Sequence, residues 1–239
     1  MNKTINLFCL PFAGGNKYSY RELAEKAPSF LNLITLEYPG RGGRMREPLP
    51  VNIDELANDL YNQVIQHPAH GYYAIYGHSL GGLMAYLLTL QLQKNGNKLP
   101  AHIFITGTPG PSAISRTEKK RHLLDQKEFI AEIQELGGMP DEILNNEELL
   151  YFFEPILRSD FKISESYIHE DNAPLNIPIT VITGTEEDMK PEDIQLWQNE
   201  TLQAVDFKRM PGKHFFIFDH SFKVVEIICK KLYLHKTPF

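Results

Sequence analysis

One serine stands in a pattern that could expose it as a nucleophile. Gly77-His78-Ser79-Leu80-Gly81 fits G-x-S-x-G and lies between an apolar run and a helix-forming run. The two glycines would let a strand and a helix approach closely enough for a sharp turn that raises the Ser79 hydroxyl above a sheet. At the start of that helix, the Leu80 N–H could donate to an oxyanion. The alternative is a glycine-rich turn whose serine only caps the helix.

A serine nucleophile needs a base to take its proton and a carboxylate to orient that base. Among nine histidines, His214 lies on the loop after the last expected strand, where the chain order serine, acid, histidine places the base. His220 falls in the final expected helix and is the weaker candidate, and His78 would point away from the neighbouring serine. The acid is sought among the carboxylates after the penultimate strand, where the sequence favours Asp188, with Glu187 as the alternative.

A second oxyanion donor should come from the loop after an early strand. Leu10-Pro11-Phe12-Ala13-Gly14-Gly15 follows the first expected strand, and its glycine pair permits a tight turn. The amides of Phe12 and Ala13 could then point inward. An ordinary turn is the alternative for this segment.

These residues need elements to position them, and short apolar runs alternate with helical periodicity along the chain. Strands are expected at Ile5–Leu10, Leu33–Tyr38, Tyr72–Tyr76, His102–Thr106, Ile179–Thr183 and Val205–Met210. Helices are expected at Tyr20–Lys26, Ile53–Ile65, Leu80–Lys94, Asp193–Leu202 and Asp219–Leu234, the last with Asp219 as its N-cap. This alternation predicts a mostly parallel, doubly wound sheet in one domain over residues 1–239, and the serine turn makes it an α/β-hydrolase fold.

Residues 112–172 interrupt the alternation. The segment is charged, lacks a convincing strand and has helical candidates at Lys127–Leu136, Asn146–Phe153 and Asp160–Tyr167. An insertion of about 60 residues exceeds an ordinary connection. It predicts a helical lid over the carboxyl edge of the sheet, and a purely structural helical layer is the alternative. Six apolar residues are candidates for the lining of a pocket beneath it: Phe12, Met139, Phe152, Phe153, Ile156 and Phe215.

Composition narrows the class of protein. The net charge of −6, without a strong basic cluster, argues against nucleic-acid binding, and 42% hydrophobic residues argue against disorder. No apolar run is long enough to span a membrane, and the N-terminal run is too short for a secretory signal. Cys9 and Cys229 form no metal or disulfide pattern, so we expect a reducing cytoplasm, no metal and no cofactor. Nothing in the sequence requires a multimer, and we expect a monomer.

The chain resembles the stand-alone type II thioesterases that accompany non-ribosomal peptide and polyketide synthases. The resemblance spans nearly the whole length, and its most specific parts are the P-G-R-G-x-R and L-R-x-D-F segments. It is carried by Leu10–Gly15, Tyr38–Arg44 with Glu47-Pro48, Gly77–Gly82, Pro155–Phe161 with Glu165 and Tyr167, Trp197 and Gly212–Phe216.

The resemblance implies a catalytic triad of Ser79, Asp188 and His214, with the amides of Ala13 and Leu80 as the oxyanion hole. The family usually has a shorter turn before the acid than this chain has. It also usually has a second glycine directly before the histidine, where this chain has a lysine. The longer acid turn is why the choice of carboxylate stays open.

The implied substrate is an acyl group on the phosphopantetheine arm of an acyl- or peptidyl-carrier domain, so the arm comes with the substrate and not as a cofactor. Phe12 and Phe215 would contact the substrate. Arg41 and Arg44 could meet the phosphate of the arm or the acidic carrier surface, and internal salt bridges are the alternative for both. Two other functions remain open from sequence: a small-molecule carboxylesterase or lipase with the same triad, and a non-catalytic binding protein with the hydrolase fold.

Overall fold

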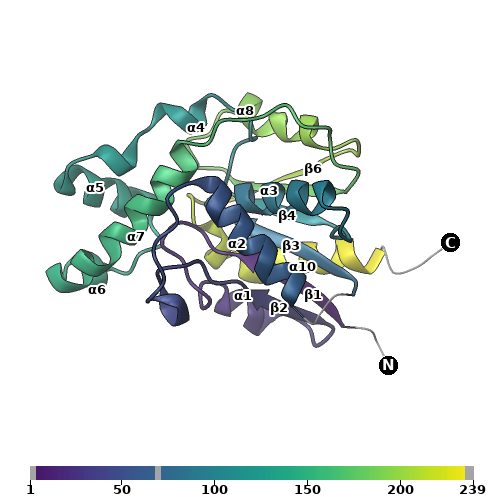
Figure 1. Cartoon of the computed structure of the whole chain (residues 1–239), viewed down its shortest axis with the longest axis horizontal. Coiled ribbons are helices and arrows are strands. Elements are labelled where there is room, and N and C mark those ends of the chain that lie inside the picture. Colours follow the sequence, from purple (N-terminus) through teal and green to yellow (C-terminus); the bar gives the residue numbers. More distant parts are fainter. Residues whose placement is uncertain (1–3, 68–70, 235–239) are drawn as a thin grey trace.

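The computed structural model describes residues 4–67 and 71–234, so both ends of the expected domain lie outside the described residues. Its centre is a six-stranded sheet in the order β2-β1-β3-β4-β5-β6 (Figure 1), and every neighbouring pair is parallel. The strands are β1 (Ile5–Leu10), β2 (Leu31–Thr35), β3 (Tyr73–His78), β4 (Ile103–Thr106), β5 (Ile179–Gly184) and β6 (Asp206–Met210). The expected parallel, doubly wound sheet is confirmed.

Helices cover both faces of this sheet. One face packs against α2 (Ile53–Gln66) and α3 (Leu80–Lys94), and the other against α1 (Arg21–Lys26) and α10 (Ser221–Leu234). Because successive strand residues point to opposite faces, β1 supplies Phe8 and Leu10 to the first core layer and Leu7 and Cys9 to the second. No described helix combines the length and the apolar character needed to cross a bilayer.

Two expected helices are each divided in the structure. The segment expected at Asp193–Leu202 forms α8 (Pro191–Gln195) followed by a 3-10 turn, η3 (Leu196–Glu200). The segment expected from Asp219 forms α9 (Phe216–Asp219) and then α10, so Asp219 ends a short helix and does not cap the long one. The short α9 therefore follows directly on the loop that carries His214.

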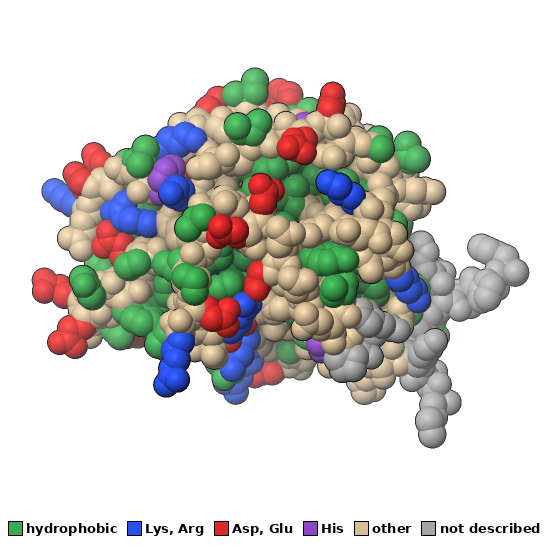
Figure 2. Space-filling model, viewed as in Figure 1, with side chains coloured by type: hydrophobic (Ala, Val, Ile, Leu, Met, Phe, Trp, Pro, Cys, Tyr) green, Lys and Arg blue, Asp and Glu red, His purple; other side chains and the backbone are tan. Residues whose placement is uncertain are grey.

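Between β4 and β5 the described chain is helical and contains no strand. It forms α4 (Ser115–Glu118), η2 (Arg121–Leu123), α5 (Gln126–Leu136), α6 (Asp141–Leu144) and α7 (Glu147–Glu165). Figure 1 shows α5, α6 and α7 at the end of the molecule opposite the two termini. At this end, Figure 2 shows hydrophobic side chains mixed with charged ones.

Within the segment expected to form a lid, which is called the lid below, α7 is one continuous helix where separate helices were expected at Asn146–Phe153 and Asp160–Tyr167. Its first turn is capped by the Asn146 side chain, which accepts hydrogen bonds from the N–H groups of Glu148 and Leu149. Pro155 lies within the helix and lacks only the N–H that would have reached the carbonyl of Tyr151. Because Tyr151 is exposed, that carbonyl can be solvated. A proline is therefore accommodated here without ending the helix.

Candidate active site

Ser79 occupies a strained turn between β3 and α3. Its backbone angles are φ 55° and ψ −119°, and it is the one non-glycine residue with positive φ in the described part of the chain. A Cβ on Gly77 would lie 2.0 Å from the carbonyl oxygen of Gly81, and a Cβ on Gly81 would lie 2.0 Å from that of Leu10. The close approach of strand, helix and neighbouring loop therefore requires both glycines, and the sharp turn that the motif predicts is present.

The loop after β1 lies against the same turn. β1 and β3 are neighbours, and the chain adds strands outward in opposite directions from this point, which is where open α/β sheets bind ligands. The N–H of Gly15 donates to the carbonyl of Phe12 at 2.9 Å and closes the loop. Ala13 and Ser79 line the same cavity, and Leu80 opens α3. The two amides expected to bind an oxyanion thus belong to segments that flank the serine.

His214 and Glu187 form the next part of the site, on the loops after β6 and β5. Two backbone hydrogen bonds join these loops, from Thr185 to Met210 at 2.8 Å and from Glu186 to Gly212 at 3.0 Å. Nδ1 of His214 is 2.7 Å from Oε1 of Glu187, whose other oxygen accepts the N–H of Gly184 at 2.6 Å. The carboxylate is 3% exposed. A buried carboxylate of this kind can fix the imidazole so that Nε2 is free for a proton.

Asp188 does not contact the histidine, and this corrects the preference for it. Its side chain is 95% exposed and lies 3.4 Å from Nζ of Lys119 on the lid. Adjacent residues in this turn point in different directions, and the longer glutamate side chain returns over the turn to His214. The sequence does contain a signal for this arrangement, because the turn after β5 is longer than the resemblance leads one to expect.

His78 is a neutral packing residue beneath the site. It is fully buried, its Nδ1 lies 3.0 Å from Oγ1 of Thr106, and its ring centroid is 4.7 Å from that of His214. Burial, and then the neighbouring charge of His214, hold the pKa of His78 well below its usual range. His78 therefore remains uncharged at neutral pH.

This buried imidazole predicts a loss of stability in mild acid. The unfolded chain binds a proton at His78 below about pH 6.5, whereas the folded chain does not, so the free energy of unfolding falls by up to about 1.4 kcal/mol per pH unit. Urea denaturation of wild type and His78→Met between about pH 7 and pH 5 measures the difference. We expect a shallower decline in the variant, and equal slopes in the two proteins would contradict this account.

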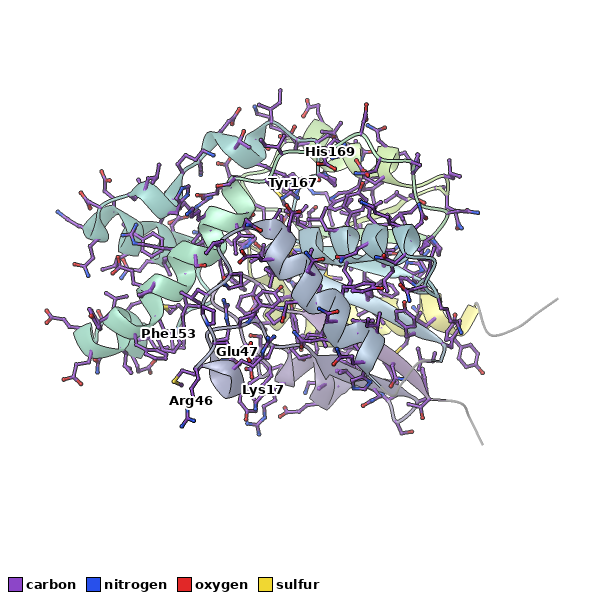
Figure 3. The ribbon with its side chains drawn as sticks, viewed as in Figure 1. Lys17, Arg46, Glu47, Phe153, Tyr167 and His169 are labelled. Carbon is purple, nitrogen blue, oxygen red and sulfur yellow. The ribbon has the colours of Figure 1, made fainter. Side chains whose placement is uncertain are left out.

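Two cavities meet at Ser79 and His214. The larger, of about 330 Å³, has a mixed polar and apolar lining, and its charged residues include Arg116, Lys119, Glu132, Glu135, Lys190 and Lys213. The smaller, of about 60 Å³, is mostly apolar and is lined by Phe12, Met139 and Phe215 of the six expected residues. Phe152, Phe153 and Ile156 do not line it. Figure 3 labels Phe153, which belongs to α7.

Comparison with known proteins decides the family. The thioesterase domain family model matches residues 5–232. The chain belongs to the thioesterase family. It is 28% identical over 235 residues to the gramicidin S biosynthesis protein GrsT of Aneurinibacillus migulanus, covering 98% of this chain and 91% of that protein. It is 29% identical over 232 residues to the thioesterase PikA5 of Streptomyces venezuelae, covering 97% and 82%.

Solved structures agree with this family. The chain is similar to ClbQ from the colibactin NRPS/PKS pathway, with a TM-score of 0.90, 32% identity and coverage of 97% and 98% of the two chains. It is also similar to the type II thioesterase BorB from the borrelidin biosynthetic cluster, with a TM-score of 0.87, 30% identity and coverage of 97% and 94%. The protein is therefore a thioester hydrolase of α/β-hydrolase type, and the alternative of a non-catalytic binding protein falls away.

In this thioesterase Arg44 does not face the cavities, which corrects its expected contact with substrate. It ends the 3-10 turn η1 (Gly42–Arg44), and its guanidinium binds both oxygens of Asp59 at 2.6 and 2.7 Å. It also contacts Glu47 and donates to the carbonyl of Glu37. Hydrogen bonds to Asp59 and then Glu47 raise the pKa of Arg44. Its donors are occupied within the protein, as the salt-bridge alternative proposed.

Arg41 and Asp160 form a buried pair that sequence reasoning did not assign. Their side chains are 3% and 0% exposed, and the guanidinium binds both carboxylate oxygens, at 2.6 and 2.7 Å. Arg41 lies in one and Asp160 in the other of the two segments most specific to the resemblance, but nothing in the sequence shows that they meet.

In the described part of the thioesterase, no group of three or more potential metal ligands occurs.

Proposed function

We propose that this thioesterase removes acyl groups from the phosphopantetheine arm of acyl- or peptidyl-carrier domains and so restores stalled non-ribosomal peptide or polyketide synthases. The observation that carries the proposal is the strained Ser79 turn, where Ser79 shares two cavities with His214, the hydrogen-bond partner of Glu187. Similarity over nearly the whole chain to proteins named for gramicidin S and colibactin biosynthesis supports this choice of substrate. The proposal places the enzyme in the cytoplasm as a monomer without a cofactor.

The chemistry begins with the attack of Ser79 Oγ on the thioester carbon while Nε2 of His214 takes the hydroxyl proton. Glu187 holds the imidazole through Nδ1 and stabilises the imidazolium that forms. The developing oxyanion accepts hydrogen bonds from the N–H groups of Ala13 and Leu80. Asp188 takes no part in these steps. The carbon–sulfur bond then breaks, and the imidazolium returns its proton to the pantetheine sulfur.

Hydrolysis of the acyl-enzyme repeats these roles with water as the nucleophile. His214 takes a proton from water, the hydroxide oxygen attacks the ester carbon, and the tetrahedral intermediate expels Ser79 with the same proton. The free acid leaves, and the serine is restored. No redox step or co-reactant besides water is needed.

The two cavities have different roles in this proposal. The larger cavity, whose mixed lining includes charged residues such as Lys119 and Glu135, suits the amide-containing pantetheine arm and its carrier. The apolar cavity between Phe12 and Phe215, whose ring centroids lie 4.9 Å apart, suits the acyl group. The thioester carbon then sits where the two cavities join, at Ser79.

A matched substrate set tests the proposal. One acyl group is presented as a carrier-domain thioester, as a thioester of a short pantetheine mimic and as an oxygen ester. We expect kcat/KM to be highest for the carrier thioester, by about tenfold or more over the mimic, because binding of the arm and carrier orients the reacting carbon. Preference for the oxygen ester would indicate a small-molecule esterase and would overturn the proposal.

A further inference from the structure

The buried pair of Arg41 and Asp160 joins the lid to the loop after β1. Asp160 lies on α7, and its Oδ2 accepts the N–H of Gly14 at 2.7 Å in addition to the guanidinium. Arg41 Nη1 also donates to the carbonyl of Gly15 at 3.2 Å. The residues of the pair are 119 positions apart in the chain. The pair therefore holds the peptide group between Ala13 and Gly14 and the one between Gly15 and Asn16.

The remainder of this loop is held from the body of the domain. The hydroxyl of Tyr20 donates to the carbonyl of Leu10 at 2.8 Å, and that of Tyr38 donates to the carbonyl of Pro11 at 2.7 Å. Both tyrosines are fully buried. The start of the loop is thus fixed to the domain, whereas its end, at Gly14, is fixed to the lid.

Van der Waals contact also connects Gly14 to the lid. A Cβ on Gly14 would lie 2.6 Å from Cδ2 of Leu157, one turn before Asp160 on α7. Gly14 has φ 74°, a conformation that glycine adopts without strain. The peptide between Ala13 and Gly14 therefore takes its orientation from a helix that belongs to the insertion and not to the sheet (Figure 1).

We propose that Asp160 and Arg41 are positioning residues that set the oxyanion-binding geometry of the Ala13 amide from the lid, so that seating α7 on the domain and completing the oxyanion hole are one event. This inference rests on the proposed role of the Ala13 amide at Ser79. Neither positioning residue lines the cavities at the serine. They act on the reaction through the loop alone.

A double variant separates positioning from folding. Losing one partner would leave the other charge buried and unpaired, and the protein could unfold, whereas replacing both by apolar residues of similar size preserves packing. Arg41→Met with Asp160→Leu should stay folded but lose the acceptor for the Gly14 N–H. We expect a fall in kcat of about 10- to 100-fold with little change in KM, because small misplacement of a catalytic donor has effects of that size.

The matched control is Ser159→Ala. The neighbouring Ser159 also ties α7 to the domain, since its hydroxyl donates to the carbonyl of Pro50 at 2.9 Å, but it does not touch the oxyanion loop. We expect this variant to keep kcat within about twofold of wild type, because the lost hydrogen bond is partly buried but lies away from the serine and its oxyanion loop.

The decisive readout is the rate at which a fluorophosphonate labels Ser79, since that reaction uses the oxyanion hole and needs no natural substrate. Affinity for a trifluoromethyl ketone should weaken in the double variant in proportion to kcat, while affinity for an unreactive amide analogue is retained. A folded double variant that is labelled at the wild-type rate, or a control that is slowed equally, would overturn the inference. If the wild-type protein is labelled by the fluorophosphonate but hydrolyses no carrier thioester, the proposed substrate is wrong. The labelling rates of the variants still test this inference in that case.

Discussion

Replacing Ser79 by alanine should lower kcat for thioester hydrolysis by about 10⁴- to 10⁶-fold while leaving the fold intact, because no other group can carry the acyl intermediate. The substitution removes only the hydroxyl group, and Ser79 lines both cavities. Release of free thiol from an acyl-carrier domain measures the loss. An alanine variant that retains a rate near that of wild type would show that the acyl group never passes through this serine.

The strained backbone provides an internal control for this variant. Ser79 has φ 55° and ψ −119°, a conformation that only glycine adopts readily. Ser79→Gly should therefore be as inactive as Ser79→Ala but more stable by about 1 kcal/mol in the free energy of unfolding. If both variants are inactive and the glycine variant has the higher free energy of unfolding, the backbone strain is located at the nucleophile.

Replacing Glu187 by glutamine should lower kcat by about 10³- to 10⁴-fold, because the amide oxygen would stay with the N–H of Gly184 and the NH2 group would face Nδ1 of His214, which favours the wrong tautomer. The matched control is Asp188→Asn, one residue along, which changes the same chemical group on a side chain exposed to solvent. We expect this control to stay within about twofold of wild type, as surface substitutions usually do. The comparison of kcat in the two variants measures which carboxylate orients the histidine.

The opposite ranking would contradict the assignment. If Asp188→Asn were the inactive variant, the 2.7 Å contact between Glu187 and His214 would not be the one used in catalysis.

The parts of the site that local sterics determine could be predicted from sequence. Gly77 is required by its close contact with Gly81 inside the motif, and the motif records both glycines directly, although Gly81 also approaches the carbonyl of Leu10 on the neighbouring strand. His214 follows from the order of the strands, since the loop after the last parallel strand ends at the same edge as the loop after β3. The parallel sheet could be predicted because apolar runs alternate with helical periodicity, which is a local pattern in the sequence.

The parts that depend on distant partners could not be predicted. The choice between Glu187 and Asp188 depends on the path of one turn and on the length of one side chain. Arg41 and Arg44 are alike in sequence, but the first meets a carboxylate on the lid and the second meets Asp59 on α2. Such pairing is a property of packing, which periodicity does not record.

The most direct test of the account is to identify the residue that carries the acyl group. Wild-type protein is mixed with an acyl-carrier domain, quenched with acid within milliseconds and digested, and the peptides are measured by mass spectrometry. The account predicts a transient mass increase equal to the acyl group on the peptide that contains Ser79, with release of the pantetheine thiol in the same phase. Thiol release with no acyl group ever found on that peptide would contradict it.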